Sequence, residues 1–425
     1  MSILLKNSTY INWDTLEFYQ TNIIVNDGIN GTIRFINDLK ELDRYIDYQT
    51  IDCKGKLVTK SFAVGHHHAY SAMARGMPAP KKQPDNFSEI LQYVWWTLDK
   101  CLDKETIELS ALVTAMACAK AGSTFVIDHH ASPNFIKGSL EIMARAFEKV
   151  GINHLLCYEI TDRDGMDKAL DGLKETENYL QNHQGLVGLH ASFTVGEKTL
   201  KNAVDMMNRY NSGIHVHVAE DLYDQEHCNS TYKKRVIQRF FDAGLLNSAK
   251  TILVHCLHLD DKERDLISNS PCWIAQNAES NMNNNVGFFN GKGLGENIMI
   301  GTDGMHSDLL QSAKAAFFVG QRFDNIDYPS AYRRFRNVHR YLRNNGFKGD
   351  GDNNLVVIDY NTATEINKDN FFGHFIFGLN SNHIQHVISS GRLIVHNQTL
   401  INVNENEILA HSRKQAKRLW ELMVR

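Results

Sequence analysis

Short apolar runs alternate with amphipathic stretches through the middle of the chain. Eight runs of strand length occupy residues 62–68, 124–130, 154–161, 186–192, 214–220, 251–258, 272–277 and 298–304. Segments with the apolar spacing of a helix lie between them, among them 105–121, 138–150, 199–210, 231–243 and 307–321. About eight strand–helix units in series predict an α/β fold, a (β/α)8 or TIM barrel.

The two ends of the chain have a different pattern. Residues 3–58 predict short strands joined by turns, with hairpin signals at Asn26-Asp27-Gly28 and Asn30-Gly31. Residues 355–360, 384–390 and 392–402 have the same style. The ends could therefore pair into one small β domain beside the barrel. Residues 405–425 predict an amphipathic helix that packs on the barrel or at a subunit interface.

Length and charge narrow the class of protein. A barrel takes roughly 250 residues, so a chain of 425 residues must hold something more. The net charge of −4 favours neither nucleic acid nor an anionic membrane. The one basic run, 332–343, has its apolar residues at helical spacing, which predicts arginines on a solvated face. No apolar run reaches the length of a membrane span.

The cysteines and the N-terminal segment bear on the compartment. Seven cysteines are scattered and form no CxxC pair, which is typical of reduced, buried thiols. The first residues lack a basic start and a sustained apolar stretch, so we expect no signal peptide. Together these features predict a cytoplasmic protein.

Histidine is abundant, with 20 residues, and it clusters at the ends of the predicted strands. Each apolar run finishes in polar residues that can often bind metal, such as HHH, DHH, HVHVAE and TDG. Barrel enzymes build their active sites at the C-terminal ends of the strands. The recurrence of this pattern from unit to unit predicts a metal-dependent active site.

The first such cluster is His66-His67-His68. Residues two apart on a strand share a side, so His66 and His68 can face the barrel axis while His67 points out. Two imidazoles on one strand end are a natural half-site for Zn²⁺ or Fe²⁺. A polar strand end with hydrogen-bonded histidines is the plainer interpretation.

The second cluster is the stretch from His215 to Glu220. His215 and His217 again share a side, and Glu220 lies just beyond the strand end. A carboxylate beside a metal ligand can carry protons between water and substrate. The alternative is an ordinary strand followed by a solvated glutamate.

Two later strand ends complete the candidate site. Strand alternation favours His255 over His258 as the histidine that faces the site. Asp303 ends an apolar run within Gly301-Thr302-Asp303-Gly304, where it could bind metal and accept a proton. A simple Asp-Gly turn is the alternative.

These motifs, in this order, resemble the amidohydrolase superfamily, in its cytosine deaminase and chlorohydrolase-like branch. HHHAYSAMARGM, IDHHASP and CYEITDRDG are most similar to the aminohydrolases called SsnA. The matching positions are the first-strand HxH at 66–68, the fifth-strand HxxE at His217 and Glu220, the sixth-strand His255, the eighth-strand TDG at 302–304, the fourth-strand His190 and the NPxSNM loop at 277–282.

The resemblance implies a site and a domain plan. His66, His68, His217 and Asp303 would bind the ion, Glu220, His255 and Asp303 would act in catalysis, and His190 would contact substrate. Both chain ends, 1–58 and 346–402, would form a composite β-sandwich around a barrel of 59–345, followed by a C-terminal helix over 403–425. Relative to the family, Lys60-Ser61 replaces Pro-Gly, Val64 replaces Asn and Ala278 replaces Pro.

The number of ions follows from the fourth run, LVGLHAS. Binuclear relatives bridge their ions with a modified lysine there, and this run has none. We therefore expect one divalent ion, zinc first and iron as the alternative. Glu159 could bridge a second ion, although a carboxylate outside the ion's ligand sphere is the commoner case.

Two further residues could line the pocket. Trp95 could stack on a planar heterocycle, or the Trp95-Trp96 pair could serve packing alone. His129 could contact the substrate, or it could orient the ligands of the first strand.

The function implied is hydrolytic deamination of a small N-heterocycle of purine, pyrimidine or triazine type. Dechlorination or opening of a cyclic amide would use the same site. A catalytically silent metal-binding barrel is the alternative of another class. We expect a small-molecule substrate, no nucleic acid or membrane partner, and possible homo-oligomers.

Overall fold

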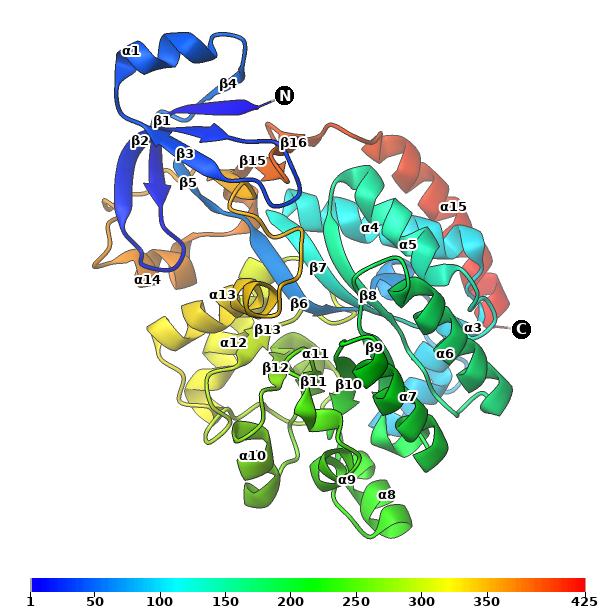
Figure 1. The fold of residues 1–425 in the computed structure, drawn as a ribbon. Coiled ribbons are helices and arrows are strands. Elements are labelled where there is room, and N and C mark those ends of the chain that lie inside the picture. Colours follow the sequence, from blue (N-terminus) through cyan, green and yellow to red (C-terminus); the bar gives the residue numbers. More distant parts are fainter. Residues whose placement is uncertain (1, 425) are drawn as a thin grey trace.

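The computed structural model describes residues 2–424 and contains an eight-stranded parallel barrel with a mixed β-sheet beside it (Figure 1). The barrel strands are nearly all buried, as expected of parallel strands covered by helices on the outside. They are β6 (Phe62–His67), β7 (Ser123–His130), β8 (Asn153–Tyr158), β9 (Val187–Ala191), β10 (Ile214–Val218), β11 (Ile252–His255), β12 (Trp273–Gln276) and β13 (Ile298–Ile300).

Two hydrogen-bonded sheets make up the barrel, and isolated bridges join them. One sheet has the order β6-β7-β8 and the other β13-β12-β11-β10-β9. A bridge between Ile160 and Leu189 joins β8 to β9, and a bridge between His67 and Asp303 joins the first strand to the end of the last. This closure brings the two ends of a long segment together, and the predicted (β/α)8 barrel is confirmed.

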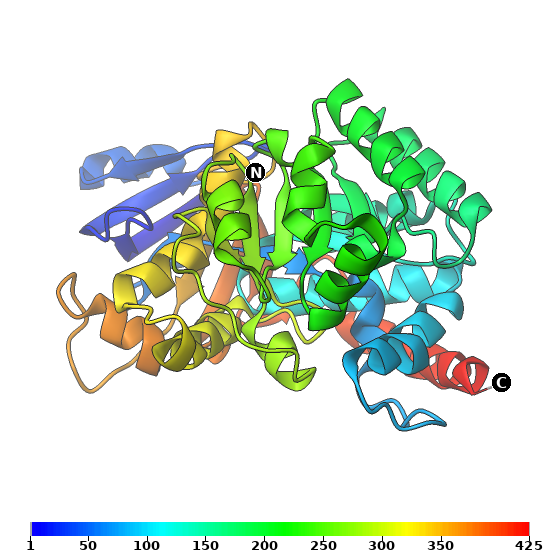
Figure 2. The same ribbon diagram turned by 90° about the horizontal axis from the view of Figure 1, so that it is seen from below.

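Helices cover the outside of the barrel (Figure 2). The main ones are α4 (Lys104–Lys120), α5 (Ser139–Val150), α6 (Met166–Leu180), α7 (Glu197–Arg209), α8 (Leu222–Tyr232), α9 (Val236–Asp242), α10 (Asp261–Ser268), α11 (Ala278–Asn283), α12 (Leu309–Phe323) and α13 (Tyr328–Asn344). The helix predicted over 231–243 is present only in part, as α9, because the first residues of that range belong to the end of α8 and the turn after it. Helix α8 ends at its C-cap Lys233, which has a left-handed backbone with a φ of 56°.

Both ends of the chain contribute to one nine-stranded mixed sheet. Its strands are β1 (Ile3–Ile11), β2 (Phe18–Val25), β3 (Ile33–Ile36), β4 (Gln49–Asp52), β5 (Leu57–Lys60), β14 (Leu355–Ile358), β15 (Ile384–Ser389), β16 (Arg392–His396) and β17 (Thr399–Leu400). The chain ends join where β5 pairs antiparallel with β14, with Val58 opposite Val357. The predicted composite β domain is therefore present.

Short helices complete the structure. They are α1 (Leu39–Leu42), η1 (Asp43–Tyr45), η2 (Ala69–Ala74), α2 (Phe87–Ile90), η3 (Leu91–Trp95), α3 (Trp96–Lys100), η4 (Ser192–Thr194), η5 (Leu245–Asn247), α14 (Phe371–Gly373), η6 (His374–Gly378) and η7 (Ser381–His383). The α2–η3–α3 segment matters for function, because it forms one wall of the main cavity.

The C-terminal helix α15 (Glu405–Met423) packs against α4, as Figure 1 shows. Arg418 donates to Asp103 at 2.6 Å, and the Trp420 indole donates to the Met73 carbonyl at 2.9 Å. The helix therefore packs on the barrel. The exact domain limits at 58, 345 and 402 stay a prediction. No helix within residues 2–424 is both long and apolar enough to cross a membrane.

Arg336 on α13 differs from the prediction that the arginines of this run are solvated. Arg336 is only 2% exposed to solvent. Its guanidinium donates hydrogen bonds to the Lys60 and Ser61 carbonyls at 3.1 and 2.9 Å. Those carbonyls lie where the chain passes from β5 of the sheet into β6 of the barrel. Arg336 thus fixes the start of the strand that carries His66 and His68.

Candidate functional site

Polar side chains from successive barrel strands converge on a cavity of about 630 Å³. Its walls come from the strand ends and from the α2–η3–α3 segment. The lining residues are His68, Tyr70, Ser71, Phe87, Leu91, Trp95, Trp96, Glu159, Arg163, His190, His217, Glu220, His255, Ser280, Asn283, Asn284, Asp303, Gly304 and Met305. The position agrees with the general location of barrel active sites.

The orientations of His68 and His217 suit the binding of a cation. The Nδ1 of His68 donates to the His129 carbonyl at 2.7 Å, and the Nδ1 of His217 donates to the His190 carbonyl at 2.8 Å. Both Nε2 atoms therefore carry lone pairs, yet they lie only 3.1 Å apart. Two hydrogen-bond acceptors cannot form a hydrogen bond with each other, whereas both nitrogens can coordinate a single cation.

His66 provides a third nitrogen. Its Nδ1 lies 2.9 Å from Nε2 of His215, whose Nδ1 in turn is 3.6 Å from the Cys157 sulfur. When Nδ1 of His66 donates its hydrogen bond to His215, Nε2 of His66 is unprotonated. That buried Nε2 has no hydrogen-bond partner. Burial also lowers the pKa of His66 and His217 well below the usual range, so both rings are neutral, as metal binding requires.

Asp303 brings a carboxylate to the same place. Its Oδ1 lies 3.8 Å from Nε2 of His66 and 3.5 Å from Nε2 of His68. Burial opposes its charge, but His68 and His255 lower the pKa of Asp303 below the ordinary value. His66, His68 and His217 form one group of donors within 4.8 Å of one another, and His66, His255 and Asp303 form another. Three nitrogens and one carboxylate suit zinc or iron.

His255 and Glu220 stand beside these donors. Nε2 of His255 is 3.3 Å from Oε2 of Glu220 and 3.7 Å from Oδ2 of Asp303. The Asn281 amide donates to Nδ1 of His255 at 2.8 Å, which leaves the proton on Nε2, toward the carboxylates. Burial raises the pKa of Glu220 well above its ordinary value, and the nearby Asp303 adds to that effect. Glu220 is thus suited to hold a proton.

The backbone is left-handed at three strand ends around the site. Ala219, His255 and Asp303 have φ values of 45°, 70° and 50°. Residues with side chains rarely adopt this region, and such positions gather at active sites. Here they turn the chain sharply after β10, β11 and β13, so that Glu220, His255 and Asp303 point into the cavity.

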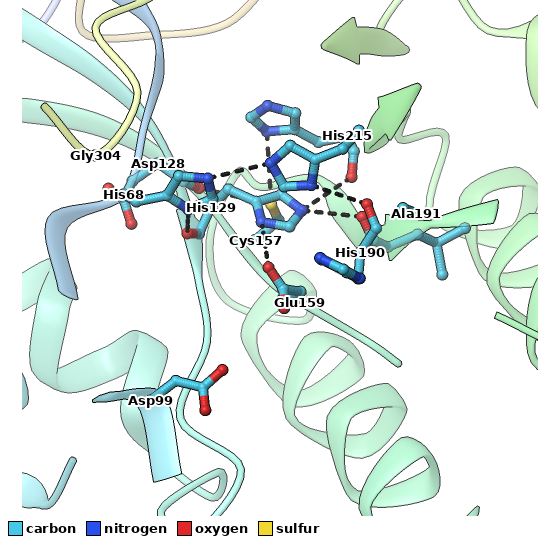
Figure 3. Close-up of polar contacts among 12 residues, drawn as sticks. His68, Asp99, Asp128, His129, Cys157, Glu159, His190, Ala191, His215 and Gly304 are labelled. Carbon is cyan, nitrogen blue, oxygen red and sulfur yellow. Dashed lines mark hydrogen bonds and ion pairs between the residues drawn. The ribbon is translucent and has the colours of Figure 1, made fainter. Parts of the chain in front are cut away.

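A second polar layer surrounds Glu159, at the end of β8 (Figure 3). Its Oε2 lies 3.4 Å from Nδ1 of His129, and its Oε1 lies 3.2 Å from Nη1 of Arg163. The Nε2 of His129 is 3.1 and 3.2 Å from the carbonyls of Leu189 and His215. His129 is fully buried and does not line the cavity, so it orients the neighbouring strands.

The remaining predicted contacts lie in the cavity wall. His190 is 6% exposed, and its Nδ1 lies 2.6 Å from the Thr194 hydroxyl. Trp95 lines the cavity from η3, and Trp96 beside it stacks under the Arg163 guanidinium at 5.0 Å. The two tryptophans therefore both contribute to the cavity wall and do not serve packing alone.

The sequence did not lead us to Arg163, or to Phe87 and Leu91 in the α2–η3 wall. Arg163 lies a few residues after the end of β8, and this position near a strand end is the feature of the sequence that could have indicated a place in the site. Nothing local indicated Phe87 or Leu91, because their segment has no strand pattern. They come to the cavity through tertiary packing.

Comparison with known proteins agrees with this geometry. The family model described as "Amidohydrolase family" matches residues 63–342. A 5'-deoxyadenosine deaminase of Methanopyrus kandleri is 26% identical over 420 residues, covering 92% of this chain and 93% of that protein. A 5-methylthioadenosine/S-adenosylhomocysteine deaminase of Thermococcus sibiricus is 26% identical over 419 residues, covering 93% and 94%.

A solved structure has the same fold across almost the whole chain. The adenosine deaminase of Xanthomonas campestris, solved with bound zinc, superposes with a TM-score of 0.82 at 16% identity and covers 98% of both chains. The family match spans more than half of the 425 residues and covers the barrel strands except for Phe62, the first residue of β6. The chain therefore belongs to the amidohydrolase family and is a hydrolase that acts on carbon–nitrogen bonds.

Proposed function

We propose that the chain is a one-metal aminohydrolase that deaminates an N-heterocycle of aminopurine or related type. One observation carries the proposal. Glu220, whose pKa is raised by burial, lies 3.3 Å from Nε2 of His255, directly beside the histidine and aspartate donors. A proton carrier next to a metal-competent cluster is the arrangement that hydrolytic deamination needs.

The donor set fits a divalent ion held by His66, His68, His217 and Asp303. When bound, such an ion lowers the pKa of a water and so supplies a nucleophile near neutral pH. Zinc is the first choice, because imidazole and carboxylate suit it, and iron is the alternative. The guanidinium of Arg163 at 3.2 Å from Glu159 supports a single ion, since that carboxylate already has a cation.

The residues of the chain divide the proton transfers. Asp303 accepts the proton of the attacking water. Glu220 donates its proton to the ring nitrogen next to the carbon under attack. Asp303 then passes the proton it took from water to the leaving amino group, and as ammonia leaves, Glu220 regains a proton from the hydroxyl group on that carbon. The Nε2–H of His255 donates a hydrogen bond to the oxygen that gains negative charge. The three groups stand close together, with Nε2 of His255 3.3 Å from Oε2 of Glu220 and 3.7 Å from Oδ2 of Asp303.

The cavity wall supports a planar substrate. Trp95 and Trp96 offer aromatic faces, and His190 places a ring nitrogen beside them. The adenosine-type deaminases among the relatives support an aminopurine. The seven cysteines are free thiols, which supports a reducing compartment such as the cytoplasm. The cytoplasmic location and a homo-oligomeric state both stay predictions.

The test is ammonia release by zinc-loaded protein from a panel of aminopurines, aminopyrimidines and aminotriazines. We expect release from at least one aminopurine and none from metal-free protein. Chloride release from a chlorinated triazine without any ammonia would assign the site to dechlorination. One tightly bound ion with no turnover on any compound would favour a silent barrel.

A further inference from the structure

The cavity has a second branch. A side pocket of about 320 Å³ shares Phe87, Leu91, His190, His217 and Glu220 with the main cavity and continues to Ala191, Phe193, Asp221, Tyr223 and Asp224. A heterocycle held against Glu220 therefore leaves two directions for its substituent. One leads along the Trp95–Trp96 wall, and the other leads into the side pocket.

Arg163 is the one lysine or arginine among the described residues that line either branch. Its Nε lies 2.9 Å from Asp164, its Nη1 lies 3.2 Å from Glu159, and its Nη2 contacts Asp99 closely. The Arg163 side chain is 7% exposed. Because each of its nitrogens already faces a carboxylate, the guanidinium has no free edge to offer a substrate anion.

The side pocket has carboxylates and no cation of its own. Asp224 accepts from the backbone N–H of Ala219 at 2.9 Å and of Phe193 at 3.1 Å. Asp221, half-buried, accepts from the N–H of Tyr223 at 2.9 Å as the N-cap of α8. A carboxylate that entered this branch would lose its water and meet two acidic groups and the Phe193 and Tyr223 rings.

We propose that the cavity selects N-heterocycles whose substituent is neutral or positively charged and rejects those whose substituent carries a carboxylate or a phosphate. The heterocycle itself rests on the proposed function. The selection is electrostatic. An anionic substituent is desolvated in either branch without a free partner, whereas an amide or an ammonium can bond the carboxylates on the walls.

A matched set of ligands tests the charge alone. The set consists of three adenine derivatives substituted at the same ring nitrogen with a propanoate, the isosteric propanamide or an aminopropyl group. The three compounds differ chiefly in the charge of this substituent. Binding to the zinc-loaded protein is measured by calorimetry, and ammonia release is measured in parallel. We expect the amide and the amine to bind at least about tenfold more tightly than the carboxylate, an effect of one interaction's size. Equal or tighter binding of the carboxylate, or no binding of any of the three, would overturn the inference.

Binding without ammonia release would leave this selectivity standing and would count against the proposed deamination. A variant separates charge from shape. Asp221→Asn keeps the N-cap of α8 but removes one negative charge from the pocket wall. It should therefore reduce the ratio of the dissociation constants of the carboxylate and amide ligands by about threefold. Asp205→Asn, an exposed position on α7, removes the same charge away from the cavity and should leave the gap unchanged. An identical response of both variants would also contradict the proposal.

Discussion

Nε2 of His255 and Oε2 of Glu220 lie 3.3 Å apart, although the two residues end different strands. The contact depends on the left-handed backbone at Ala219 and at His255 itself, which turns both side chains inward. It places a protonated nitrogen against a carboxyl group whose pKa burial raises. The pair therefore combines a hydrogen-bond donor with a proton carrier beside the metal-competent donors.

Asn281 sets the tautomer of His255, because its amide donates to Nδ1 at 2.8 Å. Asn281→Asp replaces that donor by an acceptor and should move the ring proton to Nδ1. We expect kcat to fall by about 10- to 100-fold with a smaller change in KM. Asn285→Asp, at an exposed position just after α11, is the matched control and should keep wild-type kcat. Equal kcat for the two variants would rule out this role for Asn281.

Removal of the metal should destabilise the fold. Without a cation, the lone pairs of His68 and His217 face each other at 3.1 Å. We expect chelation to lower the melting temperature by roughly 5 °C or more. Zinc should restore it, and magnesium should not, since magnesium prefers oxygen ligands. An unchanged melting temperature after proven loss of the metal would contradict this description of the site.

His339 on α13 should make stability depend on pH. The ring is 1% exposed, with Nδ1 2.9 Å from Asp350, and burial lowers its pKa to about 4 against the partial opposition of Asp350. The unfolded chain has a histidine pKa near 6.5. Between pH 6.5 and 4 it therefore binds more protons than the folded chain, so this contribution to stability is lost as the pH falls.

His339→Gln tests that contribution. The variant should show a shallower loss of unfolding free energy from pH 6.5 to 4, by up to about 1.4 kcal/mol per pH unit. Denaturant unfolding of the zinc-loaded protein at a series of pH values measures it. His411→Gln, at an exposed position on α15, is the control and should keep the wild-type slope. Parallel slopes for all three proteins would show that His339 does not titrate in this way.

Local pattern was enough to predict the barrel and its candidate cluster. Strands buried on both faces appear as continuous apolar runs, and the period of two along a strand places His66 and His68 on one side. The closure that sets Asp303 beside them was predictable in outline, because the last strand of a barrel must pair with the first.

Features that depend on tertiary contacts were not predictable. The helix break at Lys233 needs a left-handed residue that no proline or glycine marks. Arg336 looks like a surface arginine in the sequence, but it satisfies two carbonyls where the sheet meets the barrel. The pairing of Arg163 with Asp99 depends on the position of α3 beside the end of β8, which no local spacing encodes.

The most direct test of the central claim is the turnover and zinc content of Glu220→Gln, measured beside the wild type on an aminopurine that the wild type deaminates. We expect one zinc per chain in both proteins and a kcat in the variant lower by about 10²- to 10⁴-fold, the usual value of a general acid–base group. Glu226→Gln, an exposed change on α8, should keep full activity. Wild-type turnover in Glu220→Gln would contradict the assignment of Glu220 as the proton carrier.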